Sequence, residues 1–432
     1  MNTVERWRPT FALTRAALVG LGGVVIAVAL GRPDLIVLTG PLLAVAAWAA
    51  WHRPSERPAY EHRWSTMAIR EGETTGLTVR LHAVEGVESA YAELVKPAFV
   101  TVEPAFGSVA MTRGDDRFVA EIRLRSVRWG RRSVGPVTVT ASSAWDGFRA
   151  RSVAFGQREL VTSPIPATFD TAAPMPHPVG LVGQHRSLRR GDGSEFNSIR
   201  PFQVGDRLRR LHWPVSLRTG ELHSISTWAD QDAHVALVVD GADDLGPSDG
   251  IDGDASALDT TVRAAAAVAE QYLRGGDRVE LRVLDARGVR RVPPSAGTTQ
   301  LRRILDQLSA VKPGAGARFD PLNNQQRLDA GATVVMLSSL IARNALTAAA
   351  QLARSGYSVV VVDTLPEHAE PHSYNDRYAD LAWRIRLLER AREVHLIQEL
   401  GVPVVPWRGP GSLDQVLRDL TRRSAAPRLT RR

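Results

Sequence analysis

The most distinctive stretch of this 432-residue chain is GDGSEFNSIRPFQVGDRLRRLHWPVSLRTGEL, residues 191–222. It sets charged side chains such as Asp206 and Arg210 at fixed offsets from Phe196 and Trp213. A solvated loop does not need aromatic residues at such offsets, and an ordinary core strand does not carry so many charges. The pattern therefore predicts a half-buried polar network packed under Trp213, in which Asp206 pairs with Arg207 or Arg210 and Glu195 pairs with Arg200 or Arg218.

The spacing E-F-x-x-I-R-x-F-x-x-G-D-x-x-R-x-L-x-W-x-x-S-x-R-x-G-x-L in this stretch resembles the signature of the domain-of-unknown-function 58 (DUF58) family. His212 stands where that family more often has an acidic residue. Two earlier segments, Trp129–Pro136 and Asp146–Phe148, also resemble parts of the family pattern. The candidate signature and interaction residues are Glu195, Arg200, Gly205, Asp206, Arg210, Trp213, Ser216 and Arg218.

Three roles for this segment are compatible with its residues. It could be an internal network that fixes two domains together, or a docking surface, because Trp and Arg are the residues that most often anchor interfaces. Nucleic-acid binding is the weakest of the three, since alternating Glu and Asp cancel the positive field that phosphate binding needs. We therefore expect no nucleic-acid partner.

The composition excludes several classes of site. The net charge is +8, and nearly all of the positive charge is arginine, because Lys96 and Lys312 are the only lysines. No basic stripe interleaved with aromatics, typical of nucleic-acid modules, is present. The absence of cysteine excludes disulfides, thiolate metal sites and cysteine nucleophiles.

Residues 1–53 are predicted to form a transmembrane helical hairpin. Its two apolar stretches, Ala16–Gly31 and Leu35–Trp51, are each close to the roughly 20 residues that span a bilayer. Arginines flank the pair on both sides, whereas the turn holds only Arg32, so the positive-inside rule places both flanks in the cytoplasm. The expected location is the cell membrane, as a multi-pass protein, with the lipid bilayer as one partner. A cleaved signal peptide and a buried soluble hairpin are the alternatives.

The rest of the chain divides by pattern. Residues 60–166 alternate apolar and polar side chains in short runs, which predicts a β-sandwich domain. Residues 167–190 are rich in Pro and Gly and indicate a linker. Residues 191–423 hold the signature segment and an α/β domain, and residues 424–432 form a basic tail.

Continuous apolar strands alternate with helical patterns after the signature segment, which predicts a doubly wound α/β domain with a parallel sheet. The DUF58 resemblance implies that this domain is von Willebrand factor A-like. One helix, at 376–400, is expected to cover the sheet with an amphipathic face that includes Leu381, Ile385 and Leu388. The expected strands are 234–240, 278–284, 332–338, 357–362 and 402–405, and the other expected helices are 258–274, 299–310, 342–355 and 412–423.

The first strand of that domain ends at a candidate metal ligand, Asp240. In a von Willebrand factor A domain, D-x-S-x-S at this point supplies a carboxylate and two hydroxyls to Mg²⁺, but Ala242 and Asp244 occupy the two serine positions here. Asp240 and Asp244 remain possible Mg²⁺ ligands in a degenerate site, and the metal-free edge is the preferred interpretation. Without a metal, backbone N–H groups or an arginine are expected to meet the charge of Asp240.

No catalytic motif supports an enzyme. The chain lacks a G-x-S-x-G elbow, an H-E-x-x-H helix and a Walker loop, and Ala242 replaces the second acid that an aspartate-nucleophile phosphotransferase needs. The sequence favours a non-enzymatic, membrane-anchored adaptor without a cofactor, and the family resemblance implies a MoxR-type AAA+ ATPase as its partner. The alternative is a divalent-metal-dependent binding or hydrolytic protein that uses the Asp240 edge.

Overall fold

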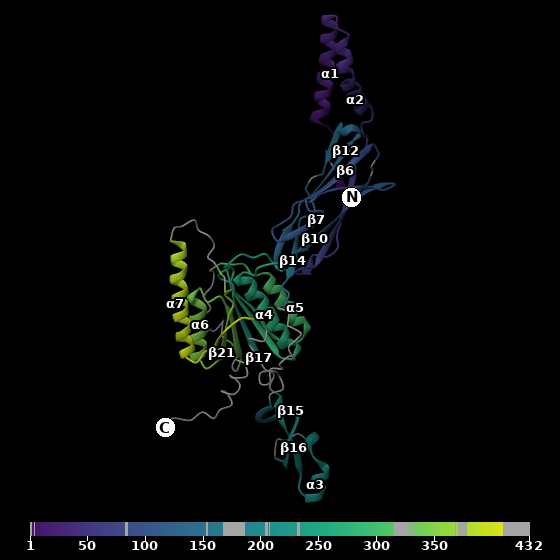
Figure 1. Cartoon of the computed structure of the whole chain (residues 1–432). Coiled ribbons are helices and arrows are strands. Elements are labelled where there is room, and N and C mark those ends of the chain that lie inside the picture. The colour runs from purple at the N-terminus through teal and green to yellow at the C-terminus, as the bar shows by residue number, and fades with distance from the viewer. Residues whose placement is uncertain are drawn as a thin grey trace. The chain divides into compact units, whose positions relative to one another are not determined.

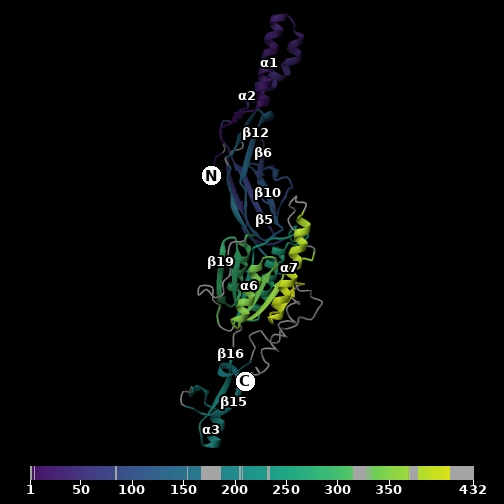
Figure 2. The same ribbon diagram turned by 90° about the vertical axis from the view of Figure 1, so that its left-hand side faces the viewer.

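The computed structural model separates the chain into two compact units (Figures 1 and 2). The first comprises Met1–Ser163 together with Gly250–Asp252, and the second comprises the remainder. The residues that the structure describes are 2–3, 5–82, 85–152, 154–166, 186–203, 206, 208–230, 234–314, 328–329, 332–367, 369 and 378–408.

Two apolar helices, α1 (Phe11–Leu30) and α2 (Asp34–Trp51), pack against each other in the first unit (Figure 1). They approach closely because glycine lines the contact: a Cβ atom added at Gly23 would lie only 2.3 Å from Thr39 Cγ2. Their outward leucines and valines are exposed rather than buried in a core. Both helices are long and apolar enough to cross a membrane, which agrees with the predicted hairpin in length and composition.

The residues before α1 belong to the β-domain, which the sequence patterns did not indicate. β1 (Asn2–Thr3) pairs with β3 (Ala59–Trp64), and β2 (Arg8–Pro9) pairs with β13 (Phe148–Arg151). Between them, Trp7 is buried in the core of the sheets. The two ends of the helix pair therefore enter one and the same domain.

The β-domain is built from largely antiparallel sheets that share one core. A six-stranded sheet has the order β1-β3-β5-β10-β7 with β9 beside β10, and a five-stranded sheet has the order β2-β13-β12-β6-β8. Alternate residues point inward, as Leu77 and Val79 do from one sheet and Ala92 and Val139 from the other, and they meet in a single cluster. A small third sheet, β11-β14-β4, includes one parallel pair.

The remaining elements of this domain are short strands and one 3₁₀ turn. Their bounds are β4 (Ala68–Arg70), β5 (Thr74–His82), β6 (Val87–Leu94), β7 (Val100–Glu103), β8 (Ser108–Ala110), β9 (Thr112–Arg113), β10 (Arg117–Ser126), β11 (Gly130–Val134), β12 (Val137–Ser143), η1 (Ala144–Asp146) and β14 (Arg158–Ser163).

A six-stranded sheet with the order β19-β18-β17-β20-β21-β22 forms the core of the second unit. Helices α4 and α5 lie over one face and α6 and α7 over the other (Figures 1 and 2). The strands are β17 (His234–Asp240), β18 (Arg278–Asp285), β19 (Gly288–Ser295), β20 (Thr333–Ser338), β21 (Ser358–Asp363) and β22 (Val404–Pro406). The helices are α4 (Ala257–Arg274), α5 (Thr298–Ser309), α6 (Arg343–Arg354) and α7 (Ala379–Glu399).

These bounds confirm the expected alternation of strands and helices from residue 234 to 406, with one addition. The sheet is parallel except for β19, an antiparallel edge strand that the sequence analysis missed. Its sequence, GVRRVPPS, carries charges and two prolines, which strands tolerate at an edge but not at the centre of a sheet. The predicted helix 412–423 and the tail 424–432 lie outside the described residues, as does most of the predicted linker.

Helix α7 covers the sheet with the face opposite to the one expected. Leu381, Ile385 and Leu388, expected to pack on the core, are exposed, whereas Arg386 and Arg390 are partly buried. The expectation was wrong because helical spacing shows which residues share a face, and not which face meets the protein.

Candidate functional site

The signature segment folds into a small substructure of its own elements. β15 (Arg186–Pro201) pairs antiparallel with β16 (His223–Asp230), and between them lie η2 (Leu208–Arg210) and α3 (Trp213–Thr219), which pack on β16. β15 begins inside the stretch that was expected to be linker, residues 167–190. Glycine ends α3 because Gly220 adopts the left-handed conformation, with φ of 74°.

An ion pair between Arg200 and Asp206 holds the loop that follows β15. Arg200 Nη2 donates to Asp206 Oδ1 over 2.6 Å, and the backbone N–H of Gln203 donates to Asp206 Oδ2 over 2.9 Å. Both charged side chains are mostly covered. The hydrogen bond from Arg200, followed by that from Gln203, lowers the pKa of Asp206 below its ordinary value, so the carboxylate stays ionised. A carboxylate–guanidinium pair therefore forms in the segment, but Arg200 with Asp206 is not one of the pairs that the sequence led us to expect.

Ser216, which is buried, connects the start of α3 to β16. Its hydroxyl donates to the carbonyl of His212 over 2.9 Å and accepts the backbone N–H of His223 over 2.9 Å. His212 caps the helix, because its Nδ1 accepts the N–H of Val215. A histidine at the position where the family more often has an acid thus still serves as an N-cap acceptor.

Trp213 does not lie over this network, contrary to the expectation. It is 58% exposed, and Leu217, one helical turn later, is 80% exposed. Residues four apart share one face of a helix, so the two apolar side chains stand together on the outward side of α3 while Ser216 points inward. Leu208 and Leu222 of the same segment are also exposed. These four apolar side chains of the signature are therefore open to solvent, whereas Phe202 and Leu211 are half-buried, and the polar contacts described above form the frame of the segment.

The remaining signature residues differ in burial. Arg218 is exposed on α3, and Arg210 is half-buried in η2. Glu195 lies in β15, where the structure describes only its backbone, and Gly205 lies outside the described residues.

The edge of the α/β sheet that holds Asp240 is the second candidate. Asp240 ends β17 and Ser338 ends the neighbouring strand β20, which is where ligands bind in open α/β sheets. The Ser338 hydroxyl donates to Asp240 Oδ2 over 2.7 Å, and the backbone N–H of Ala242 donates to Oδ1 over 3.1 Å. Burial raises the pKa of Asp240 above its ordinary value, these two hydrogen bonds oppose the rise, and the charge of Asp243 adds to it.

We expected backbone N–H groups or an arginine to meet the charge of Asp240, and the N–H of Ala242 does so. The arginines of α7 contact other groups of this edge. Arg390 pairs with Asp363 at the end of β21 and donates through Nε to the carbonyl of Ser339 over 3.0 Å. Arg386 donates to the carbonyl of Ile341 over 2.6 Å through Nη2. Sequence reasoning missed Asp363, although it ends a buried strand just as Asp240 does. Asp244 is half-buried in the loop after β17.

Comparison with known families finds a match that begins within the signature segment and extends over most of the α/β sheet. Residues 198–371 match the family model described as "Protein of unknown function DUF58". This match supports the resemblance drawn from the signature residues, and it covers the signature from residue 198 onward together with Asp240, Ser338 and Asp363. It assigns no activity to either of them.

Similar proteins are known from mycobacteria. A protein of Mycobacterium bovis and its counterparts in two strains of Mycobacterium tuberculosis, all described as uncharacterized, are each 32% identical to this chain over 141 residues. The aligned part covers 32% of this chain and 44% of each relative, so it spans less than half of their length. Among solved structures, the cupredoxin domain of amoB from Nitrosocaldus yellowstonii is 11% identical, with 29% of this chain and 98% of that chain covered and a TM-score of 0.17, and this likeness carries no argument.

Proposed function

We propose that this chain is a non-enzymatic, membrane-anchored interaction protein that docks a protein partner through Trp213 and Leu217. The observation that carries the proposal is the outward position of these two apolar side chains, on a helix whose Ser216 is buried and bonded to the backbone. Tryptophan at an exposed site is the residue type that most often dominates binding energy at interfaces. An exposed apolar surface of this kind marks an interaction site more often than a catalytic one.

The partner that we propose is a MoxR-type AAA+ ATPase, on the strength of the DUF58 resemblance. The role of this chain would be that of an adaptor or a substrate-side partner. Arg218 follows Leu217 on α3 and is exposed, so its charge can orient the partner while the arginine itself stays in solvent.

The test is capture of the ATPase from detergent-solubilised membranes by the full chain and by a Trp213→Ala variant. We expect the variant to lose about 2 kcal/mol of binding energy, roughly 30-fold in affinity, with an unchanged melting temperature because Trp213 is largely exposed. Trp145→Ala is the matched control, since Trp145 is an exposed tryptophan of the other unit, 67% exposed. Equal capture by Trp213→Ala and the parent chain would refute the docking role of this surface.

We further propose that α1 and α2 cross the cell membrane as a hairpin with both flanks in the cytoplasm. The pairing of β1 and β2 with strands that follow the hairpin supports a single side for the two flanks. It also argues against signal-peptide cleavage, because cleavage near Ala29 would remove Trp7 from the core of the β-domain. Protease added to right-side-out vesicles should spare the β-domain and the α/β domain, and their digestion would disprove this orientation.

The second candidate function is divalent-metal-dependent binding or hydrolysis at the Asp240 edge, which the position of Asp240 and Ser338 on adjacent strand ends favours. A Mg²⁺ site filled at a hundredfold excess over its Kd stabilises a protein by about 2.7 kcal/mol. Titration of the full chain with Mg²⁺ separates the two functions, because an interaction protein without this site keeps its melting temperature.

A further inference from the structure

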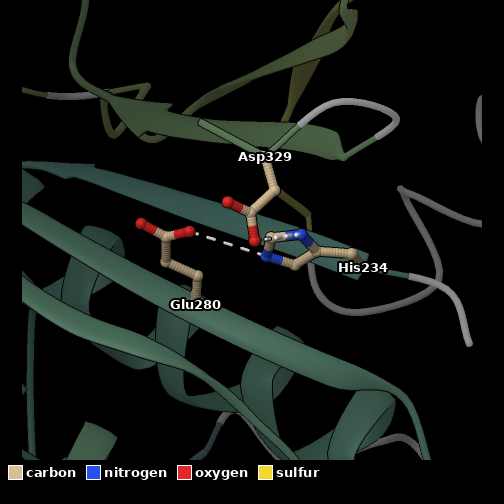
Figure 3. A group of neighbouring side chains, drawn as sticks. All are labelled: His234, Glu280 and Asp329. Atoms are coloured by element: carbon tan, nitrogen blue, oxygen red, sulfur yellow. Dashed lines mark ion pairs between the residues drawn. The ribbon is translucent and has the colours of Figure 1, made fainter. Parts of the chain in front are cut away.

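Three side chains with metal-binding atoms meet near the opposite end of the central strands. His234 is the first residue of β17, and Glu280 belongs to β18 on one side of it, while Asp329 precedes β20 on the other side (Figure 3). The parallel register sets Ala236 beside Glu280. Three separate chain segments thus converge on His234, and none of the three residues belongs to the signature segment or to the Asp240 edge.

The distances within this group are too long for hydrogen bonds. His234 Nε2 lies 3.5 Å from Glu280 Oε2, and His234 Nδ1 lies 3.6 Å from Asp329 Oδ2 (Figure 3). Direct N–H···O bonds are typically about 2.7–3.2 Å long. Among the described residues, neither His234 Nε2 nor Glu280 Oε2 has a hydrogen-bond partner, although Glu280 is fully buried. A buried carboxylate oxygen without a donor is costly unless something else compensates it.

We propose that His234, Glu280 and Asp329 bind one divalent transition-metal ion, for which Zn²⁺ is the representative. One donor atom from each residue lies within 4.8 Å of the other two, so small side-chain movements bring all three to the ligand distances of about 2.0–2.2 Å that Zn²⁺ requires. Imidazole nitrogen with two carboxylates suits this class of ion, whereas Mg²⁺ prefers oxygen alone. Asp329 is 59% exposed, which gives the ion a path from solvent and leaves a position for water.

The arginines around Glu280 set its orientation. Arg282 and Arg291 both donate through Nε to Glu280 Oε1, each over 2.8 Å, and this leaves Oε2 directed at His234. Carboxylates that bind metals are commonly held in this way by further hydrogen bonds. The two positive charges also weaken the attraction for a cation, so the affinity falls below that of a site without them.

The test uses the untagged full chain in detergent, stripped with a chelator and equilibrated with Zn²⁺ alone. We expect about one bound Zn²⁺ per chain by elemental analysis, and a visible absorption spectrum typical of a four- or five-coordinate site when Co²⁺ replaces it. Asp329→Asn and His234→Gln should each weaken Zn²⁺ binding by about tenfold or more in competition with a chromophoric chelator. Asp329 is largely exposed, so its variant should keep the fold even if the His234 variant does not.

Two controls make the outcome decisive. Asp240→Asn removes the carboxylate of the other sheet edge and should leave Zn²⁺ binding unchanged, and Trp213→Ala should do the same, which keeps this site independent of the proposed docking function. Absence of stoichiometric Zn²⁺ in the parent chain would overturn the proposal. So would equal Zn²⁺ affinity in the parent and the Asp329→Asn variant, because the three residues would then form an ion-pair network only.

Discussion

The signature segment and the Asp240 edge lie in the same unit and handle polar groups in opposite ways. On α3, the polar Ser216 turns inward and bonds the backbone, while Trp213 and Leu217 face outward. At the Asp240 edge, the hydroxyl of Ser338 and the backbone N–H of Ala242 both donate hydrogen bonds to the Asp240 carboxylate. Among the residues that the structure describes, the first region exposes apolar side chains to solvent, whereas the second holds a charge whose hydrogen-bond donors lie inside the protein.

This difference teaches that the richest run of charges in a sequence need not be its most exposed part. In the signature, the pair of Arg200 and Asp206 holds a loop, and the surface that we propose for docking consists of side chains outside the pair. At the sheet edge, the arginines of α7 bond to Asp363 and to loop carbonyls, so the usual ligand position of the fold is largely closed by the chain itself.

The largest effect is expected from a charge placed on the open surface. Leu217→Asp puts a carboxylate at the 80% exposed position of α3 and should reduce capture of the partner by more than about 100-fold, because a desolvated charge without a counter-ion opposes docking. Folding should be unaffected, as judged by the melting temperature. Leu222→Asp, at a less exposed position of the same segment, tests the extent of the surface. Full capture of the partner by Leu217→Asp would show that the exposed face of α3 is not a docking surface, and that the two regions differ only in how their side chains pack.

A smaller effect is expected from loosening the frame. Asp206→Asn removes the ion pair with Arg200, and hydrogen exchange should become faster in residues 198–226 while the α/β sheet stays protected. The folded-state pKa of Asp206 is lowered, so its stabilising contribution is present above the unfolded pKa of about 3.9 and is lost as the pH falls through the lower folded value.

The pH dependence can be followed at Trp213 itself. Fluorine NMR of 5-fluorotryptophan, with the Trp213 signal assigned by Trp213→Phe, should report a transition in the parent below about pH 4 that is absent in Asp206→Asn. The same titration curve in both proteins would show that the pair does not hold the segment in shape.

The sheet of the second unit could be predicted from sequence because its strands are buried on both faces. A run such as HVALVVD, residues 234–240, has no polar face and is bounded by loop residues, and the same holds for residues 333–338 and 358–363. The alanine-rich helix α4 was equally clear, with Ser256 and Asp259 forming a capping box at its start. Asp240 followed from the rule that functional groups gather at strand ends.

The features that could not be predicted depend on contacts that periodicity does not encode. The spacing of Trp213 and Leu217, or of Leu381 and Ile385, shows that they share one face of a helix. Whether that face points to solvent or to the protein depends on which side of the helix makes the polar contacts with the rest of the chain. β1 and β2 are only two residues long and escape any pattern of alternation. His234, Glu280 and Asp329 are far apart in the chain, so no spacing in the sequence predicts that they lie together.

A modest effect is expected at the closed edge. Asp240→Asn can keep both hydrogen bonds, since an amide offers an oxygen to Ala242 and an N–H to Ser338, so stability should change by only about 1 kcal/mol. The folded-state pKa of Asp240 is raised, so stability present below the unfolded pKa is lost as the pH rises through the folded pKa. The melting temperature of the variant relative to that of the parent should therefore increase as the pH rises. Capture of the partner should persist in the variant. A loss of capture would mean that the closed edge takes part in binding.

The smallest effect is expected from reopening that edge to a metal. Ala242→Ser with Asp244→Ser restores the two hydroxyls of the D-x-S-x-S pattern beside Asp240, and oxygen ligands are those that Mg²⁺ prefers. At a Mg²⁺ concentration equal to the Kd, the gain in stability is only about 0.4 kcal/mol, so calorimetric titration is a better measurement than melting. We expect Mg²⁺ binding in the double variant and none in the parent, with binding lost again when Asp240→Asn is added. If the parent already binds Mg²⁺ and Asp240→Asn abolishes the binding of both the metal and the partner, the edge is a metal-dependent binding site and the metal-independent interpretation is wrong.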